Sequence, residues 1–301
     1  MQYSWIFLGL SVILSVGSIV LIFTRGLNFG TDFRGGITLV YQVPTTTTEH
    51  QLTEIFLEKK VPPFVVQRIG QADSGHFVVK SDIPHDRTSE YSKPFTEALV
   101  GKLGQGQITL EKEEFVGPKV GKELRTKGIY AMLWAWVIML IYVGFRFDFY
   151  FAPGAIVALF HDTLITVGAF ALTQREVNLT VVAAMMTIVG YSMNDTIIIF
   201  DRIRENLVKH KGLPLVRIIN ISLSQVLIRT LITSLTVFFV VVVLFFRAEG
   251  DIKDFAFAMI VGVLVGTYSS DFIASPVFWF LRTYGHRFGI KPKHSRVVTT
   301  G

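Results

Sequence analysis

GYSMNDTIIIFDR, residues 190–202, is the stretch of this chain from which fold and function follow most directly. Asn194 and Asp195 lie inside an apolar run, 177–201, that is long enough to cross a bilayer, which takes about 20 residues. A carboxylate at membrane depth costs about 2.5–3.5 kcal/mol on insertion scales. A helix that only faced lipid would have no reason to carry this cost, so Asp195 is the first candidate functional residue.

The composition indicates an integral membrane protein. Hydrophobic residues make up 50% of the 301 residues and mean hydropathy is +0.49, so the chain is more apolar than a soluble domain of this length. There is no cysteine, which excludes disulfides, thiolate metal sites and cysteine nucleophiles. The histidines are scattered, so no metal site is expected. The basic excess lies beside apolar runs, where it sets topology, and no nucleic-acid partner is expected.

Six apolar runs are long enough to span a bilayer. They cover about 5–23, 128–146, 150–173, 177–201, 223–246 and 254–281. The first run has no basic segment before it and no small-residue cleavage site after it, so we expect a retained anchor rather than a signal peptide. Lys and Arg gather in 202–221 and 282–301, which predicts that this loop and both termini are cytoplasmic.

A polar insert of about a hundred residues, 24–127, follows the first run and is predicted to lie outside the cytoplasm. Lysines at its C-terminal edge contradict the positive-inside rule, but long translocated domains largely do not follow that rule. Alternating apolar and polar residues, separated by clusters of turn-forming residues, predict a β-α-β-β-α-β order, which is typical of a ferredoxin-like α+β domain. The expected strands are 37–43, 64–69, 76–80 and 107–115, and the expected helices are 49–60 and 89–103.

The predicted fold is therefore an α-helical polytopic membrane protein with six transmembrane helices and an inserted small α+β ferredoxin-like extracytoplasmic domain. Four parts follow one another along the chain. They are a first transmembrane helix at 1–23, the external domain at 24–127, a five-helix bundle at 128–281 and a cytoplasmic basic tail at 282–301.

Arg229 is the candidate partner of Asp195. On the helical rise of 1.5 Å per residue, Asp195 lies roughly 9 Å from the cytoplasmic end of its run, and Arg229 lies roughly 10 Å into the next run. The matching depths predict an ion pair, which would offset much of the cost of burying both charges. Two interpretations stay open: a proton binds to and leaves Asp195 near neutral pH, or the pair is static and only orients the helices.

Further polar residues interrupt the apolar runs. Gly190 and Asn194 are four residues apart and share a narrow face, which predicts close helix packing. His161 and Asp162 lie roughly 17 Å into their span by the helical rise. They are either a proton relay, since histidine has the right pKa range, or a hydrogen-bonded structural pair. Asp271 is expected to belong to a polar seam with a local kink.

Two glycine-containing segments flank the insert. Asp32, Gly35 and Gly36 belong to DFRGG, which is expected to be a turn before the first strand. Gly117–Pro118 and Gly121 are expected to form a hinge between the insert and the second span. Neither segment is a phosphate-binding loop, and the sequence contains no zinc-ligand spacing and no nucleophile elbow. We therefore expect a protein that is not an enzyme.

Four segments resemble the motifs of the SecF family. They are LNFGTDFRGG (27–36), FVGPKVGKEL (115–124), ALFHD (158–162) and GYSMNDTIIIFDRIREN (190–206). Members of this family are the smaller partners of SecD in the bacterial protein-export accessory complex and belong to the resistance-nodulation-division superfamily.

The resemblance implies a multi-pass subunit of the cytoplasmic (inner) membrane that pairs with a SecD-like subunit into a twelve-helix unit. That unit would assist the SecYEG translocon, capture the translocating polypeptide and couple its movement to proton entry. In the family an acid in span four and an arginine in span five matter for proton conduction, and they fall on Asp195 and Arg229. No cofactor is implied beyond H⁺ or Na⁺ as the coupling ion. The acid on the SecD side is missing here, so proton transport by this chain alone is not expected.

Other functions remain open. An intramembrane aspartyl protease needs two acids that meet, and Asp195 with Asp162 or Asp271 would supply them. Against it, Arg229 would hold one acid charged, whereas such a dyad shares a proton. A small-molecule or lipid exporter would need a larger external domain. The last alternative is a membrane scaffold without ion coupling, in which substitutions of Asp195 and Arg229 would be silent.

Overall fold

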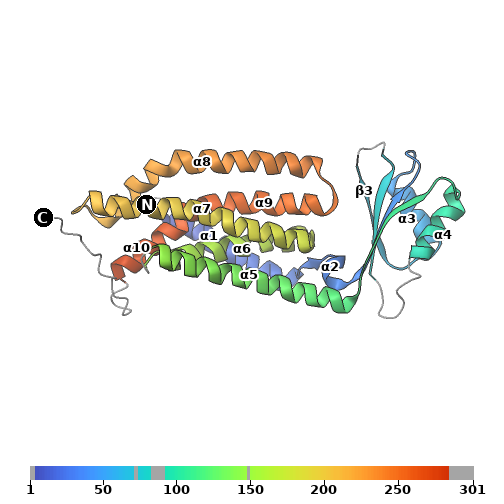
Figure 1. The fold of residues 1–301 in the computed structure, drawn as a ribbon, viewed down its shortest axis with the longest axis horizontal. Helices are drawn as coiled ribbons and strands as arrows, with labels where there is room; N and C mark the ends of the chain where they lie inside the picture. The colour runs from blue at the N-terminus through green and yellow to red at the C-terminus, as the bar shows by residue number, and fades with distance from the viewer. Residues whose placement is uncertain (1–3, 71–73, 83–91, 148–149, 285–301) are drawn as a thin grey trace.

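The structure is a computed structural model that describes residues 4–70, 74–82, 92–147 and 150–284. A long bundle of helices occupies one end and a small domain built on a β-sheet occupies the other (Figure 1). Within the described ranges six helices are long and apolar enough to cross a membrane. The chain is therefore a multi-pass membrane protein, as its hydropathy predicts.

The spanning helices extend further than the apolar runs. They are α1 (Ser4–Arg25), α5 (Pro118–Arg146), α6 (Ala152–Thr173), α7 (Leu179–Lys209), α8 (Leu215–Arg247) and α9 (Gly250–Ser269), which continues through the π-helical turn η1 (Ser270–Ala274) into α10 (Ser275–Tyr284). Helix α5 starts at Pro118 rather than near residue 128, because Gly117 caps it and a proline at the first helical position leaves no donor unpaired. The loop expected at 202–221 is mostly helical, because α7 continues to Lys209 and α8 begins at Leu215.

Helix α7 runs through the middle of the bundle and packs against α6, α8 and α9. Its buried face contributes to two apolar clusters, one toward each end of the bundle. At the end of the bundle far from the sheet, Phe151, the residue before α6, stacks on Phe278 of α10, with ring centroids 4.1 Å apart. It also contacts Phe200 of α7 at 4.9 Å. These ring contacts fix α7 against two neighbours.

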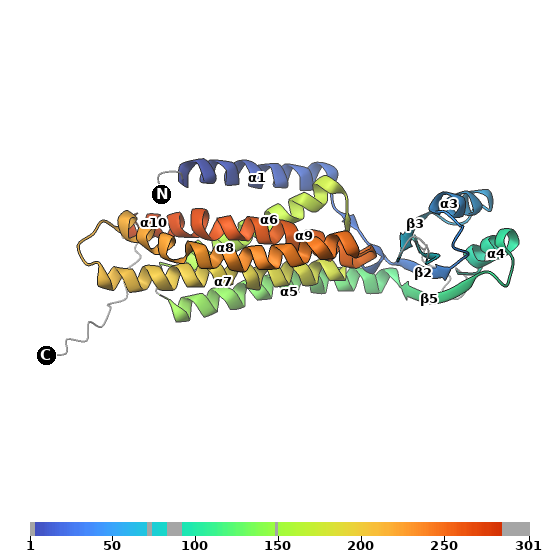
Figure 2. The same ribbon diagram turned by 90° about the horizontal axis from the view of Figure 1, so that it is seen from above.

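Helices α1, α5 and α8 form the outside of the bundle. Helix α1 lies along α6 on one side (Figure 2). All three helices expose large apolar side chains, among them Ile13, Val20, Trp134, Ile138, Ile232 and Phe239. An apolar surface of this extent faces lipid or the helices of another membrane protein.

The external domain is an antiparallel four-stranded sheet with two helices. Its elements are β2 (Gly36–Gln42), α3 (Glu49–Glu58), β3 (Phe64–Ile69), β4 (His76–Ser81), α4 (Ser92–Leu103) and β5 (Thr109–Val116). The spatial order of the strands is β3-β4-β2-β5. Helix α3 begins at a capping box in which Thr48 and Gln51 satisfy each other's backbone N–H groups, and it buries Leu52 and Phe56 against the sheet.

The predicted element bounds hold closely here. The strand expected at 64–69 is confirmed at both ends, and the other three strands shift by at most two residues. The second helix is described from Ser92 onward, and residues 89–91 lie outside the described ranges. Most of the predicted basic tail, 285–301, also lies outside them.

Three short elements join the external domain to the bundle. They are β1 (Asn28–Phe29), α2 (Thr31–Arg34) and β6 (Glu176–Val177). Strand β1 pairs in parallel with β6, so the segment after α1 lies beside the segment before α7. The DFRGG segment, expected to be a turn, is thus a short helix followed by the first residue of β2.

Candidate functional site

Asp195 lies near the middle of α7 and its carboxyl group points into the bundle. The residue is 1% exposed, and its oxygen Oδ2 accepts a hydrogen bond from Ser234 Oγ of α8 at 3.3 Å. The second oxygen, Oδ1, is buried and has no hydrogen-bond partner among the described residues. Buried polar atoms are nearly always paired, so this oxygen is an exception that calls for a functional explanation.

The predicted ion pair between Asp195 and Arg229 is wrong for this structure. Asn206 of α7 donates to Ser222 Oγ of α8 at 2.9 Å, and this contact sets how the two antiparallel helices align. With that alignment Ser234 lies opposite Asp195. Arg229 is five residues earlier, roughly 7.5 Å nearer the start of α8 and about 140° around the helix. Depth within the span was a poor guide because it gives neither the rotation of α8 nor its alignment with α7.

Arg229 faces outward and is exposed in the isolated chain. Together with Asp201, Glu205 and two further arginines, Arg146 and Arg202, it lines a cavity of about 210 Å³ beside α7 and α8. Its guanidinium group therefore belongs to a mixed group of charges and forms no ion pair with Asp195.

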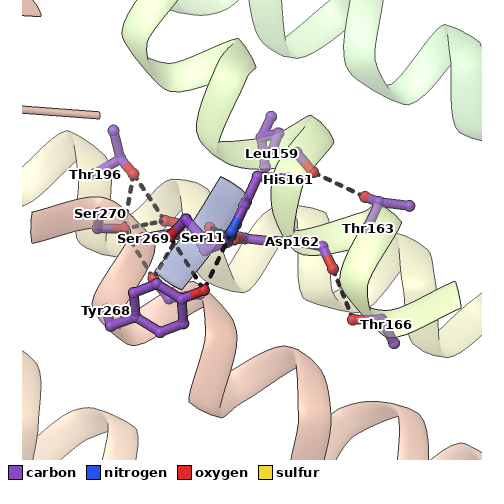
Figure 3. Close-up of polar contacts among 12 residues, drawn as sticks. Ser11, Leu159, His161, Asp162, Thr163, Thr166, Thr196, Tyr268, Ser269 and Ser270 are labelled. Carbon is purple, nitrogen blue, oxygen red and sulfur yellow. Dashed lines mark hydrogen bonds and ion pairs between the residues drawn. The ribbon is translucent and has the colours of Figure 1, made fainter. Parts of the chain in front are cut away.

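His161 and Asp162 of α6 form the centre of a second polar cluster, shown in Figure 3. Asp162 is 1% exposed, and both oxygens of its carboxylate have hydrogen-bond partners. Oδ2 accepts from Ser192 Oγ of α7 at 2.6 Å and from Ser269 Oγ of α9 at 2.8 Å, and Oδ1 lies 3.0 Å from His161 Nδ1. One carboxylate thus joins three helices.

The cluster extends from His161 to the outermost helix. His161 Nε2 lies 3.1 Å from the Tyr268 hydroxyl, which in turn accepts from Ser11 Oγ of α1 at 3.5 Å. A consistent arrangement has Nδ1–H donating to Asp162 and Nε2 accepting from Tyr268. Hydroxyl, imidazole and carboxylate groups thus form a continuous chain of contacts from α1 to α7, which is the connectivity that both a proton relay and a structural network require.

Ser192 and Thr196 of α7 form a polar seam that belongs to Asp162 and not to Asp195. Thr196 Oγ1 lies 2.9 Å from Ser270 Oγ, at the start of the π-helical turn η1. Asp271 follows Ser270 in that turn and is half-buried. The predicted local irregularity is therefore a π-helical turn, a feature often found at functional sites.

Gly190 and Asn194 do share a face of α7, but the predicted close helix packing there is absent within this chain. Both residues are exposed, and a Cβ atom at Gly190 would meet nothing within 4 Å. Close packing occurs instead at glycines that the sequence did not single out. A Cβ at Gly154 of α6 would lie 2.7 Å from the carbonyl oxygen of Ala274, and one at Gly266 of α9 would lie 3.1 Å from Ser192 Cβ.

The glycines next to the external domain lie in a tight junction. Gly35 has φ 84°, and a Cβ there would lie 2.7 Å from Pro118 Cα. A Cβ at Gly36 would lie 2.6 Å from the carbonyl oxygen of Ser81 at the end of β4, and one at Gly121 would lie 2.9 Å from Gly35 N. Gly117 itself caps α5, as described above.

Asp32 occupies a position that the sequence did not reveal. Its Oδ2 accepts the backbone N–H of Leu179 at 3.0 Å and so caps the helix that carries Asp195. Ser234 and Tyr268 were also missed, because a single hydroxyl in an apolar run gives no signal of its own. In the described ranges no three His, Asp or Glu side chains gather as ligands for a metal ion.

Comparison with known proteins identifies the family. Residues 96–284 match the C-terminal region of the protein export membrane proteins SecD/SecF, and residues 20–43 match the SecD/SecF GG motif. The chain belongs to the SecD/SecF family. The GG motif covers Gly35 and Gly36, and the larger match includes the helices that carry Asp162, Asp195 and Arg229.

Within the SecD/SecF family, curated relatives of similar length carry the name protein translocase subunit SecF. One from Calditerrivibrio nitroreducens is 40% identical over 94% of this chain and 93% of its own length. Another, from Haemophilus influenzae, is 38% identical over 88% of this chain and 80% of its own length.

A solved relative shares the fold. The crystal structure of SecDF from Thermus thermophilus, titled a translocon-associated membrane protein, superposes with a TM-score of 0.81 and 32% identity. The match covers 94% of this chain and only 38% of that chain.

Proposed function

We propose that this chain is the SecF-type subunit of a Sec protein translocase. With a SecD-type partner it uses the proton motive force to promote protein export across the cytoplasmic membrane. The names of its relatives support the translocase role, and the buried carboxylate of Asp195 supports the coupling to an ion. The accessory subunit would act as a transport protein and not as an enzyme.

The observation that carries the coupling is the unpaired oxygen of Asp195. A charged carboxylate at this depth is costly, whereas a protonated one is not, so protonation has a large effect on the packing of α7 against α8. One elementary charge that crosses 100 mV supplies about 2.3 kcal/mol. A binding event can shift a conformational equilibrium only by its difference in affinity between the two states. Proton binding at Oδ1 provides such a difference.

The same site favours H⁺ over Na⁺. A sodium ion in a membrane transporter is held by several oxygens, including unwound backbone carbonyls. Asp195 has one hydroxyl contact, from Ser234, and sits in an unbroken stretch of α7. A proton needs only the free lone pair of Oδ1.

The outward face of α7 and α8 supports a SecD-type partner. Gly190, Asn194 and Arg229 are exposed in the isolated chain although they lie within spanning helices. Polar side chains inside a membrane face a protein neighbour or water rather than lipid. The SecDF crystal structure holds a second portion in the same polypeptide, and we propose that a separate SecD-type subunit fills this place here. The assembled complex would then bind the translocon and the exported polypeptide.

We further propose that the external domain at 24–127 is ferredoxin-like and lies outside the cytoplasmic membrane, with both termini in the cytoplasm. The sheet order β3-β4-β2-β5, with α3 and α4 packed on one apolar core, supports the fold. Arg202, Arg204 and Lys209 at the far end of α7 support the orientation.

The protease alternative has less support. Asp162 accepts from Ser192, Ser269 and His161, so its oxygens are not free to share a proton with Asp195. Cleavage of a transmembrane substrate by the purified protein would support the protease alternative.

Potential-driven export from vesicles tests the proposal. Asp195→Asn keeps the side-chain size and removes the titratable group, so we expect it to abolish the stimulation of export by the membrane potential while the complex still assembles. Asp201→Asn, at the cytoplasmic end of the same helix, is the matched control. Wild-type export by Asp195→Asn in proton-loaded vesicles would refute the proposal.

A further inference from the structure

Contacts from the external domain converge on four residues, Glu176–Leu179, that lead into the first turn of α7. This segment consists of β6 and the residues that cap the helix. It is the outer end of the same helix that carries Asp195, sixteen residues further along, roughly 24 Å by the helical rise. A contact that holds these four residues therefore holds one end of α7.

The first contact is a pair of ionic interactions made by Lys80. Its Nζ, on β4 of the external sheet, lies 2.7 Å from Glu176 Oε2 and 3.0 Å from Asp251 Oδ1. The Lys80 side chain is 11% exposed and that of Glu176 is 19% exposed, so this pair is shielded from salt far more than a surface pair. Burial alone would lower the pKa of Lys80, but the two carboxylates outweigh it and the pKa is raised. Lysine is thus held in its charged form.

The second contact comes from the GG-motif segment. Asp32 Oδ2 accepts the N–H of Leu179 at 3.0 Å, and Gly30 N donates to the carbonyl oxygen of Val177 at 2.9 Å. Strand β1 pairs with β6 through Asn28 and Glu176. The Asp32 side chain therefore holds the first residue of α7 by a hydrogen bond, and β1 holds the residues before it by backbone pairing.

The segment that carries Asp32 is itself joined rigidly to the external domain. The backbone of Gly36 lies against Ser81, the last residue of β4, and Gly35 and Gly121 are in backbone contact at the start of α5. Close packing of this kind leaves no room for one part to slide past the other. Asp32 and Lys80 thus belong to one body, and Glu176–Leu179 is clamped between them.

The clamp also reaches α9. Asp251 lies in the first turn of α9, and Arg175 Nη1 lies 2.8 Å from Asp254 Oδ1 one turn further on. Lys80 therefore bridges the outer ends of α7 and α9, the two helices that pack on either side of the Asp162 cluster. Glu249 adds a hydrogen bond from Gly70 N of the external domain.

We propose that Lys80 and Asp32 are the coupling residues that pass a displacement of α7 to the external domain, through the segment Glu176–Leu179. The inference rests on the proposed function, because it takes proton binding at Asp195 as the event that moves α7. It assigns the DFRGG segment a mechanical role, and it moves the transmission point from the predicted hinge at Gly117 to the start of α7.

The test separates proton flux from export in one preparation. The complex of this chain with a SecD-type partner and the translocon is reconstituted in vesicles, and both quantities are measured under an imposed potential. Lys80→Met keeps the stem and removes the charge, and Asp32→Ala removes the cap. We expect both variants to conduct protons like the wild type while the potential stimulates export at least about fivefold less, the lower range of measured coupling between sites.

Two controls make the result specific. Lys102→Met makes the same substitution on α4 of the same domain, where the exposed lysine pairs with Glu58 of α3, and should keep both activities. Lys80→Arg keeps the charge opposite both carboxylates and should restore most of the export. Hydrogen exchange of the β2 amides reports whether the sheet is intact. If Lys80→Met loosens the sheet, the test of the proposal rests on Asp32→Ala, because Asp32 lies outside the sheet.

Export that both variants leave unchanged would overturn the proposal. So would a loss of proton flux equal to the loss of export, because the residues would then act on the ion site and not on transmission. An absence of proton flux in the wild type would instead reject the proposed function, so the two failures are distinguishable.

Discussion

Ser234 Oγ of α8, and not the guanidinium of Arg229, contacts the carboxylate of Asp195, at 3.3 Å. This single contact leaves Oδ1 open and places Arg229 about one and a half helical turns away. Oδ1 is therefore the atom at which we propose that a proton binds. Arg229, which the resemblance associates with conduction, lies closer to the start of α8 than this carboxylate does.

Ser234→Ala removes the one hydrogen bond to this carboxylate. Hydrogen bonds to charged groups contribute about 1.5–3 kcal/mol, so the ionised form of Asp195 loses support. We expect export at a fixed potential to fall by at least about tenfold, the lower end of what this range implies. Ser224→Ala on the exposed side of α8, where the hydroxyl only contacts a carbonyl of its own helix, should be silent. Equal export by both variants would show that the Ser234 contact has no role.

Arg229→Met distinguishes a role within this chain from a role in the complex. An exposed arginine without a partner inside the bundle contributes little, so the free energy of unfolding of the isolated chain should change by less than about 0.5 kcal/mol. Export by the complex should nevertheless be lost. If Arg229 were paired with Asp195 inside the chain, its removal would cost about 3–5 kcal/mol, which thermal unfolding in detergent would detect at once.

Asp162→Asn tests whether the second cluster is a structural network. Three donors converge on this carboxylate, and an amide in its place would set its own N–H groups against at least one of them. We expect a loss of about 1–3 kcal/mol in the free energy of unfolding of the isolated chain. Tyr268→Phe, which removes only the outer hydroxyl, should cost less. Unchanged stability with lost export would favour the proton-relay interpretation instead.

Two glycine substitutions should have opposite effects. Gly35→Ala forces a side chain into φ 84° and against Pro118, so we expect the isolated chain to lose about 1–3 kcal/mol of stability. Gly190→Ala adds a methyl group in open space on a helix and should raise stability by up to about 1 kcal/mol. Thermal unfolding of the two variants side by side measures both. A similar loss in both would mean that Gly190 packs against this chain after all.

The sequence predicted most of the fold because hydropathy and strand alternation are local signals. Six spans, the four strands of the external sheet and the burial of Asp195 all follow from runs of neighbouring residues. The Asp195–Arg229 pair failed for a specific reason. Depth in the membrane gives position along a helix, but the rotation of α8 and its alignment with α7 are set by Asn206 and Ser222, which look unremarkable in the sequence.

The sequence also did not predict contacts between residues far apart in the chain. Lys80 and Glu176 are 96 positions apart, and Asp32 and Leu179 are 147 apart, so no local pattern links them. Gly190 was singled out for its spacing with Asn194, yet that face lies open, whereas Gly154 and Gly266 carry the tight helix contacts. Spacing shows which residues share a face, and only the packed structure shows what that face meets.

Carbodiimide labelling of Asp195 tests the central claim most directly, because the reagent attacks protonated carboxyl groups in apolar surroundings. The complex is labelled in vesicles over a series of pH values, and the peptide that contains Asp195 is quantified by mass spectrometry, with Asp195→Asn as the blank. We predict labelling that falls as pH rises through the neutral range and that changes when a potential is imposed. Labelling of Asp195 that is independent of pH would contradict proton coupling at this residue.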